Sequence, residues 1–226
     1  MSGAPTSGKP DAGAARAPAF DAAFVDAFHD LLGWRRDVRR FADAPLAPAL
    51  VETLLAQAHM APSVGNSQPW RFVLVEDDAR REAIRENFRK ANAEALASYD
   101  GERAGLYARL KLEGLTAAPV QLAVFCDEGT CQGDGLGRRT MPEMLAYSCV
   151  CAVNTLWLAA RARGVGMGWV SILDPLRAGE ALEVPSGWRL VAYLCLGYPV
   201  EEHPDPELER AGWEARSGLS ERIFRR

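Results

Sequence analysis

Histidine and cysteine are scarce in this chain of 226 residues, and neither occurs at metal-binding spacings. The three histidines are His29, His59 and His203, and the five cysteines form no Cys-x-x-Cys pair. Because protein metal sites need such ligands at set intervals, no metal site is expected. An odd number of cysteines without a framework spacing predicts free, mostly buried thiols, and with no secretion signal a reducing cytoplasm is the expected location.

The glycine and serine motifs of several large enzyme classes are also missing. The chain has no Gly-x-Gly-x-x-Gly, no P-loop and no Gly-x-Ser-x-Gly. These absences argue against a Rossmann dinucleotide site, a P-loop NTPase and a serine hydrolase.

Neither the charge nor the apolar runs point to a nucleic acid or a membrane. There are 26 Lys and Arg against 30 Asp and Glu, a net charge of −4, so a general nucleic-acid binder is not expected. No apolar run approaches the roughly 20 residues that a membrane-spanning helix needs, so no membrane association is expected.

The composition that remains is that of one globular domain, with 48% apolar and 25% charged residues. Residues 1–18, rich in Ala, Gly, Pro and Ser, are predicted to be a flexible tail, and residues 19–226 to form the domain. Hydrophobic periodicity predicts helices at 20–32, 50–58, 79–97, 106–115 and 142–163. Short apolar runs predict strands at 71–75, 120–125, 168–173 and 189–196. The pattern indicates an α/β or α+β fold with several helices on a small sheet. The helix at 142–163 is apolar on nearly every side, so its own core or another subunit should cover it all round.

A dense arginine cluster follows the first predicted helix. It reads Arg35-Arg36-Asp37-Val38-Arg39-Arg40, with four arginines in six positions. Guanidinium groups suit a phosphate or the carbonyl oxygens of a ring, although a solvated basic turn is an equally good interpretation. The neighbouring cations should hold Asp37 ionised by lowering its pKa; its simpler role is an ion pair that holds the arginines in place.

Two further segments have the residues of a ligand site. The loop at 61–70 gathers hydroxyls, amides and free backbone N–H groups, which can grip the edge of a polar planar ligand: Ser63, Gly65, Asn66 and Gln68. In Gly164–Ser171, glycines permit close backbone approach to a flat ring, and Ser171 places a hydroxyl in a predicted strand. A plain surface connection and a tight turn with a core serine are the alternatives.

From about residue 20 to the C-terminus, the chain resembles the nitroreductase-like flavoprotein superfamily. The resemblance rests on four motifs in this order: RRDVRRF, APSVGNSQPW, GVGMGWVS and LCLGYP. Within this superfamily, the chain is most similar to the branch that makes 5,6-dimethylbenzimidazole, the lower ligand of vitamin B12. Ordinary nitroreductases typically have serine at the position of Asp37, and the segment 106–114 is similar to the lid of that branch.

The resemblance implies an α+β nitroreductase-like fold, with a small, mixed but mostly antiparallel sheet packed by helices, and an intertwined homodimer with FMN at the subunit interface. It also implies the FMN-binding residues: Arg35, Arg36, Val38, Arg39, Ser63, Gly65, Asn66, Gln68, Gly166, Gly168 and, at the phosphate, Arg216.

The reaction that the resemblance implies consumes the flavin. Reduced FMN, supplied by a separate flavin reductase, is the substrate, and O2 drives its fragmentation to 5,6-dimethylbenzimidazole and erythrose 4-phosphate. Asp37 would act as base or proton shuttle, and Ser171 would hydrogen-bond the ring. Two alternatives stay open: an NAD(P)H-dependent FMN nitro or quinone reductase of the same superfamily, and a non-enzymatic flavin-binding or iodotyrosine-deiodinase-like relative.

Overall fold

The computed structural model describes residues 17–109 and 114–226. The predicted tail at residues 1–18 lies almost entirely outside the described residues, so this domain boundary stays a prediction. The predicted helix at 106–115 falls on the end of α4 (Gly101–Arg109) and the start of α5 (Gly114–Ala117), and its residues 110–113 also lie outside.

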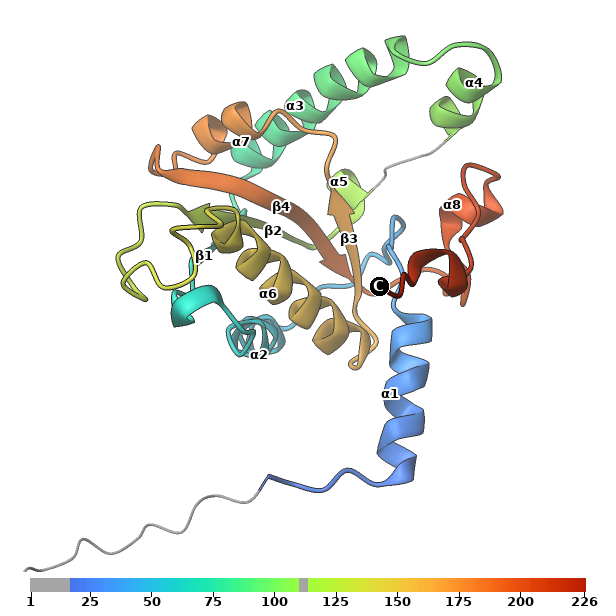
Figure 1. The fold of residues 1–226 in the computed structure, drawn as a ribbon. Helices are drawn as coiled ribbons and strands as arrows, with labels where there is room; N and C mark the ends of the chain where they lie inside the picture. Colours follow the sequence, from blue (N-terminus) through green and yellow to red (C-terminus); the bar gives the residue numbers. More distant parts are fainter. Residues whose placement is uncertain (1–16, 110–113) are drawn as a thin grey trace, which may run out of the picture.

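A four-stranded sheet forms the centre of the fold (Figure 1). The strands are β1 (Trp70–Leu74), β2 (Val120–Asp127), β3 (Gly166–Val170) and β4 (Trp188–Gly197), in the order β1-β2-β4-β3. Every neighbouring pair is antiparallel. Among the described residues, the parallel part of the predicted mixed sheet is reduced to an isolated bridge between Asp37 and Met167. The predicted α+β fold with a small, mostly antiparallel sheet is confirmed.

Helices cover both faces of this sheet. On β2, Leu122 and Val124 point to one face, where α6 (Met144–Arg161) and α2 (Pro48–Ala58) pack. The alternate residues Ala123 and Phe125 point to the other face. That face is covered by α3 (Asp78–Ala97), α5 and α7 (Pro175–Ala181). Because both faces are buried, β2 is a continuous apolar run rather than an alternating one.

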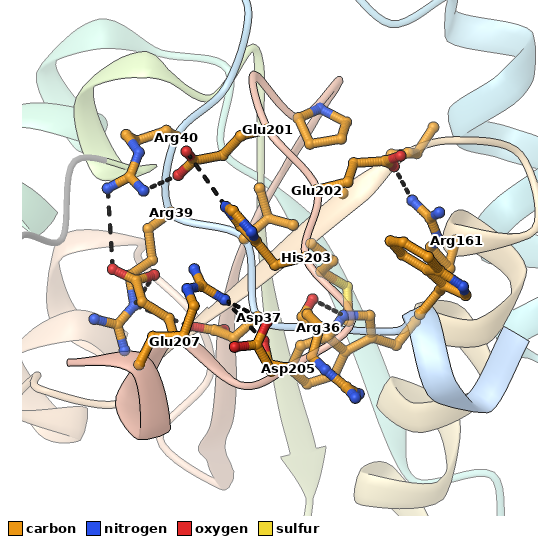
Figure 2. A pocket seen from close by; sticks show the side chains of 18 residues that line it. Arg36, Asp37, Arg39, Arg40, Arg161, Glu201, Glu202, His203, Asp205 and Glu207 are labelled. Carbon is orange, nitrogen blue, oxygen red and sulfur yellow. Dashed lines mark hydrogen bonds and ion pairs between the residues drawn. The ribbon is translucent and has the colours of Figure 1, made fainter. Parts of the chain in front are cut away.

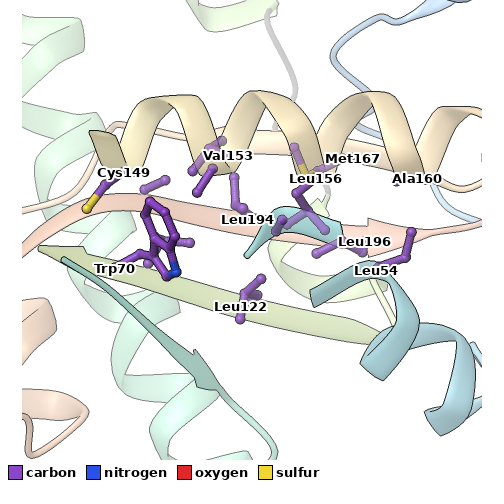
Figure 3. Close-up of a cluster of buried hydrophobic side chains, with 14 of the residues drawn as sticks. Leu54, Trp70, Leu122, Cys149, Val153, Leu156, Ala160, Met167, Leu194 and Leu196 are labelled. Carbon is purple, nitrogen blue, oxygen red and sulfur yellow. The ribbon is translucent and has the colours of Figure 1, made fainter. Parts of the chain in front are cut away.

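The larger core lies between α6 and the sheet (Figure 3). There Leu156 of α6 meets Leu194 of β4 and Leu122 of β2, with Leu54 of α2 at the edge, and all four are about 1% exposed or less. Burying each such leucine contributes about 1.5–3 kcal/mol. This packing fixes α6 against the sheet and so sets where its two ends lie.

The outer face of α6 is not covered by the residues that the structure describes. Seven of its side chains are buried, but Tyr147 and Val150 are 52% and 41% exposed. The described residues of one chain therefore enclose only part of this helix, and cover of the rest by another subunit stays a prediction. By length and composition α6 could cross a membrane, contrary to the sequence-based expectation, although it packs here as the central helix of the core.

The first helix, α1 (Ala22–Trp34), projects from the domain and buries none of its side chains (Figure 1). Asp21 caps its N-terminus by accepting a hydrogen bond from Phe24 N. The predicted helix at 20–32 ends too early: Gly33 lies inside α1, and the helix ends when Arg35 adopts an extended conformation. The remaining short elements are η1 (Val64–Asn66), α8 (Glu207–Arg210) and η2 (Leu219–Arg222).

Candidate active site

The segment after α1 runs along the outer edge of β3. Val38 N donates to Met167 O at 3.0 Å, and Trp169 N donates to Asp37 Oδ1 at 2.9 Å. A Cβ on Gly168 would lie 2.2 Å from Val38 O, and one on Gly166 would lie 2.8 Å from Val38 Cγ2. These glycines therefore allow β3 to pack closely against the segment that carries Asp37. Their predicted role toward a ring stays a prediction.

The carboxyl group of Asp37 sits between a backbone amide and a cation. Its Oδ2 accepts a hydrogen bond from Arg39 Nε at 3.2 Å. Burial nevertheless raises the pKa of Asp37, and the Trp169 amide and Arg39 only partly oppose this effect. The expectation that the arginines would lower this pKa is wrong, because loss of water outweighs one shared guanidinium.

Both predicted catalytic residues line one cavity of about 190 Å³. Asp37 and Arg39 lie on one side, and Ser171 follows the end of β3. Ser171 was expected inside the strand; it lies just beyond Val170 and is exposed. The strand ends before Ser171, so this residue lines the cavity from outside the ladder.

Three residues that the sequence did not single out as ligand contacts close this cavity. Tyr107 of α4 donates its hydroxyl hydrogen to Asn92 Oδ1 at 2.9 Å, and its ring lies 6.3 Å from that of Trp213. Burial raises the pKa of Tyr107, so its hydroxyl stays protonated. The predicted lid at 106–114 is described only at its two ends, and among the described residues α4 reaches the cavity through Tyr107.

The arginine cluster is partly buried rather than solvated. Arg35 stacks over Trp157 at 4.7 Å, and Arg36 donates to its neighbour's carbonyl and to Pro204 O. Among the described residues, Arg36 Nε and Arg39 Nη1 are buried without a hydrogen-bond partner. Such donors are costly unless a ligand satisfies them, so this segment fits a molecule rich in acceptor oxygens.

Arg216 belongs to the same positive region. Burial lowers the pKa of Arg36, and the charges of Arg35 and Arg216 lower it further. Three guanidinium groups that repel one another form a site that an anion would stabilise. Acidic groups surround the cluster: Arg40 pairs with Glu201 and Arg161 with Glu202 (Figure 2).

The loop with the predicted flavin-edge residues lies elsewhere in the chain. Ser63 Oγ accepts from Gln68 N at 3.0 Å, and Asn66 Oδ1 accepts from Gln68 Nε2 at 2.9 Å. Gly65, at φ 55°, is so close to the carbonyl of Leu136 that a Cβ would lie 2.9 Å from it.

This loop and the arginine cluster contact opposite ends of α6. Val64 N donates to Ser148 Oγ, whereas Arg36 O accepts from Trp157 Nε1. Nine residues of helix, about 13 Å, separate the two anchor points. One chain therefore does not bring Ser63, Gly65, Asn66 and Gln68 to Asp37.

The described residues contain no group of three or more His, Cys, Asp or Glu side chains that could hold a metal ion. All five cysteines are free; Cys126, Cys149 and Cys195 are buried as expected, but Cys131 and Cys151 are exposed.

Known proteins share both the sequence and this architecture. A model of the nitroreductase family matches residues 32–198. A 5,6-dimethylbenzimidazole synthase of Rhodospirillum rubrum is 60% identical over 199 residues, which are 88% of this chain and 94% of that protein. One of Rhodobacter capsulatus is 46% identical over 86% of this chain and 94% of its own length. Among solved structures, oxidized iodotyrosine deiodinase bound to FMN and 3-iodo-L-tyrosine superimposes with a TM-score of 0.69 at 26% identity, over 87% of this chain and 97% of that one. With a matching family model, relatives of this identity and a shared fold, the chain belongs to the nitroreductase family.

Proposed function

We propose that this chain is a 5,6-dimethylbenzimidazole synthase, which uses O2 to fragment reduced FMN into that base and erythrose 4-phosphate. The observation that carries the proposal is the nearly full-length similarity to two relatives of that name, at 60% and 46% identity. The geometry supports it, because Asp37 and Ser171 line one cavity that α4 closes.

In this proposal, reduced FMN is the substrate and the arginine cluster binds it. Arg36 Nε and Arg39 Nη1 are buried donors without partners among the described residues, which suits the oxygens of the ribityl chain and ring. Arg35 and Arg216 add positive charge for the phosphate. The bound ring supplies the electrons that O2 accepts.

We assign proton transfer to Asp37. Its raised pKa brings the carboxyl group closer to working pH, where it can both accept and release a proton. We assign to Ser171 a hydrogen bond to the ring, because it lines the same cavity. α4, held by Tyr107 against Asn92, keeps water out of the site.

We further propose that the active protein is a homodimer. The loop that carries Asn66 and Gln68 reaches a site at Asp37 only if a second copy supplies it. The exposed apolar residues of α1 and α6 offer a surface for that copy, among them Phe24, Phe28 and Val150. A cytoplasmic location and a separate flavin reductase complete the proposal.

The deciding experiment is an aerobic incubation of the purified protein with excess reduced FMN, followed by chromatographic analysis. We expect 5,6-dimethylbenzimidazole to accumulate with loss of flavin. Reoxidation to FMN without loss of flavin would refute the proposal. Steady consumption of NAD(P)H with tightly held oxidised FMN would instead support the nitro or quinone reductase, and no redox turnover in either flavin state would support a binding protein.

Asp37→Asn tests the assigned acid. It keeps the shape of the side chain, so binding of reduced FMN and uptake of O2 should remain while product formation is lost. An unchanged product yield would remove Asp37 from catalysis.

The shared site predicts complementation between two inactive variants. Asp37→Asn and Gln68→Ala are each expected to make little product alone. When the two are mixed and allowed to exchange subunits, a mixed dimer has one intact site, and about a quarter of wild-type activity should return. If both residues served the same chain's site, mixing would restore nothing.

A further inference from the structure

The cation beside Asp37 is shared with a second acid from far along the chain. Arg39 Nε lies 3.2 Å from Asp37 Oδ2 and 3.6 Å from Glu207 Oε2. The Arg39 side chain is only 11% exposed, whereas those of Asp37 and Glu207 are 36% and 23% exposed, so solvent screens each contact from the side of the acid. Figure 2 shows Glu207 and Asp37 approaching Arg39 from different elements.

Glu207 is itself held in place. It is the first residue of α8, its side chain is 23% exposed, and its Oε1 lies 3.9 Å from Arg40 Nη1. Arg40 is anchored in turn by Glu201. Glu207 is therefore a fixed negative charge beside Arg39, rather than a mobile surface group.

The other ionisable groups around Asp37 are neutral or paired. They come from every element that packs around it: Cys195 of β4, Tyr107 of α4, Arg161 of α6, Arg210 of α8, and His203 and Asp205 before α8. Asp205 and Arg210 pair with each other at 3.3 Å. Burial raises the pKa of Cys195 to about 12 and also raises that of Tyr107, so both stay protonated. Arg161 is paired with Glu202, and His203 Nε2 lies 3.5 Å from Glu201. Arg39 and Glu207 are thus the charged side chains left to act on Asp37, apart from the flanking Arg36.

We propose that Glu207 is a positioning residue for the proposed reaction: by taking a share of the Arg39 cation, it leaves Asp37 free to change its protonation state during turnover. A carboxylate that alone held a buried guanidinium would be a weak base, since such a partner lowers its pKa by about 1–3 units. The negative charge of Glu207 acts in the opposite direction and raises the pKa of Asp37.

Glu207→Gln separates this role from simple packing. Glutamine keeps the size and can still accept a hydrogen bond from Arg39, but it removes the charge. The pKa of Asp37 should then fall by about half a unit. Glu209→Gln is the matched control, because Glu209 is exposed on the same helix and its charge acts on Arg36. It should leave the Asp37 titration unchanged.

The titration is measured by NMR on protein with carbon-13 in the aspartate carboxyl groups, with Asp37→Asn to assign the signal. The expected result is a lower Asp37 titration midpoint in Glu207→Gln than in wild type. Glu207→Asp, whose shorter chain retains the charge, should give a midpoint between those of wild type and Glu207→Gln. The acid limb of the pH profile of product formation should move to lower pH together with the Asp37 midpoint. Equal midpoints in wild type and Glu207→Gln, or an equal shift in Glu209→Gln, would overturn the inference.

This readout needs no product, although the inference rests on the proposed function for its meaning in turnover. A shifted Asp37 titration in a protein that makes no 5,6-dimethylbenzimidazole would refute the synthase and with it the positioning role. Product formation with an unshifted titration would refute the role of Glu207 alone.

Discussion

Adding one methyl group at residue 168 is expected to displace the segment that carries Asp37. In Gly168→Ala the new Cβ would lie 2.2 Å from Val38 O, whereas real Cβ contacts essentially never fall below 3.0 Å. The carbonyl must therefore move by at least 0.8 Å. That shift acts directly on two hydrogen bonds, from Val38 N to Met167 O and from Trp169 N to Asp37 Oδ1.

The cost follows from these contacts. Overpacking of this kind costs about 1–3 kcal/mol, and a weakened hydrogen bond to a charged group adds about 1–2 kcal/mol. We expect the free energy of unfolding to fall by roughly 2–5 kcal/mol, a large part of the ~5–15 kcal/mol of a typical domain. Product formation should be lost even where the variant is still folded, because Asp37 loses its backbone donor.

Urea denaturation followed by fluorescence measures the first effect, and chromatography of the product measures the second. Gly33→Ala is the control, since nothing lies within 4 Å of its Cβ position and alanine favours the helical conformation of α1. Its stability should equal or slightly exceed that of wild type. A Gly168→Ala variant with wild-type stability and yield would refute the close packing of β3 against residues 37–38.

Three further predictions follow from single contacts. Asp37→Asn should raise the Tm at pH 8, and the gain should shrink toward pH 4. Because the pKa of Asp37 is raised in the folded state, protonation of Asp37 stabilises the fold at a pH below the unfolded-state pKa. That stabilisation is lost as the pH rises through the folded-state pKa. Trp213→Ala removes the ring contact that helps to hold Tyr107 and α4 over the cavity. With water admitted, O2 should be released as hydrogen peroxide more often, and the ratio of 5,6-dimethylbenzimidazole to hydrogen peroxide should fall several-fold. Val150→Asp should halve the mass seen in size-exclusion chromatography, whereas Leu176→Asp, 79% exposed on α7, should not; an unchanged mass would argue against α6 as the contact.

Local sequence was enough to predict the four strands and the longer helices of the fold. The apolar runs at 120–125 and 189–196 correspond to the two central strands, because a strand covered on both faces has few polar positions. The first helix extends past its predicted end at residue 32, since Gly33 can also adopt the helical conformation and tertiary contacts of Arg35 decide where the helix stops. Ser171 was placed inside β3 because periodicity locates an element better than its last residue.

The candidate site was predictable where its residues are close in sequence. Asp37 and its arginines stand out as a cluster, and Ser171 follows a glycine-rich turn. Glu207, Asn92 and Trp213 come from other parts of the chain, and no local pattern marks them, because only the folded chain brings them to Asp37.

The direction of the Asp37 pKa shows why charge spacing alone is a poor guide to electrostatics. Asp37 has four arginines within three positions of it in the sequence. If all four acted on it equally, they would favour the ionised carboxylate. In the folded chain, Arg35 stacks on Trp157, Arg40 pairs with Glu201, and Arg39 is divided between Asp37 and Glu207. The carboxyl group thus loses water without gaining a cation of its own, and desolvation decides the sign. An acid in that condition is suited to moving a proton, and this is the physical reason for our proposal that Asp37 transfers one.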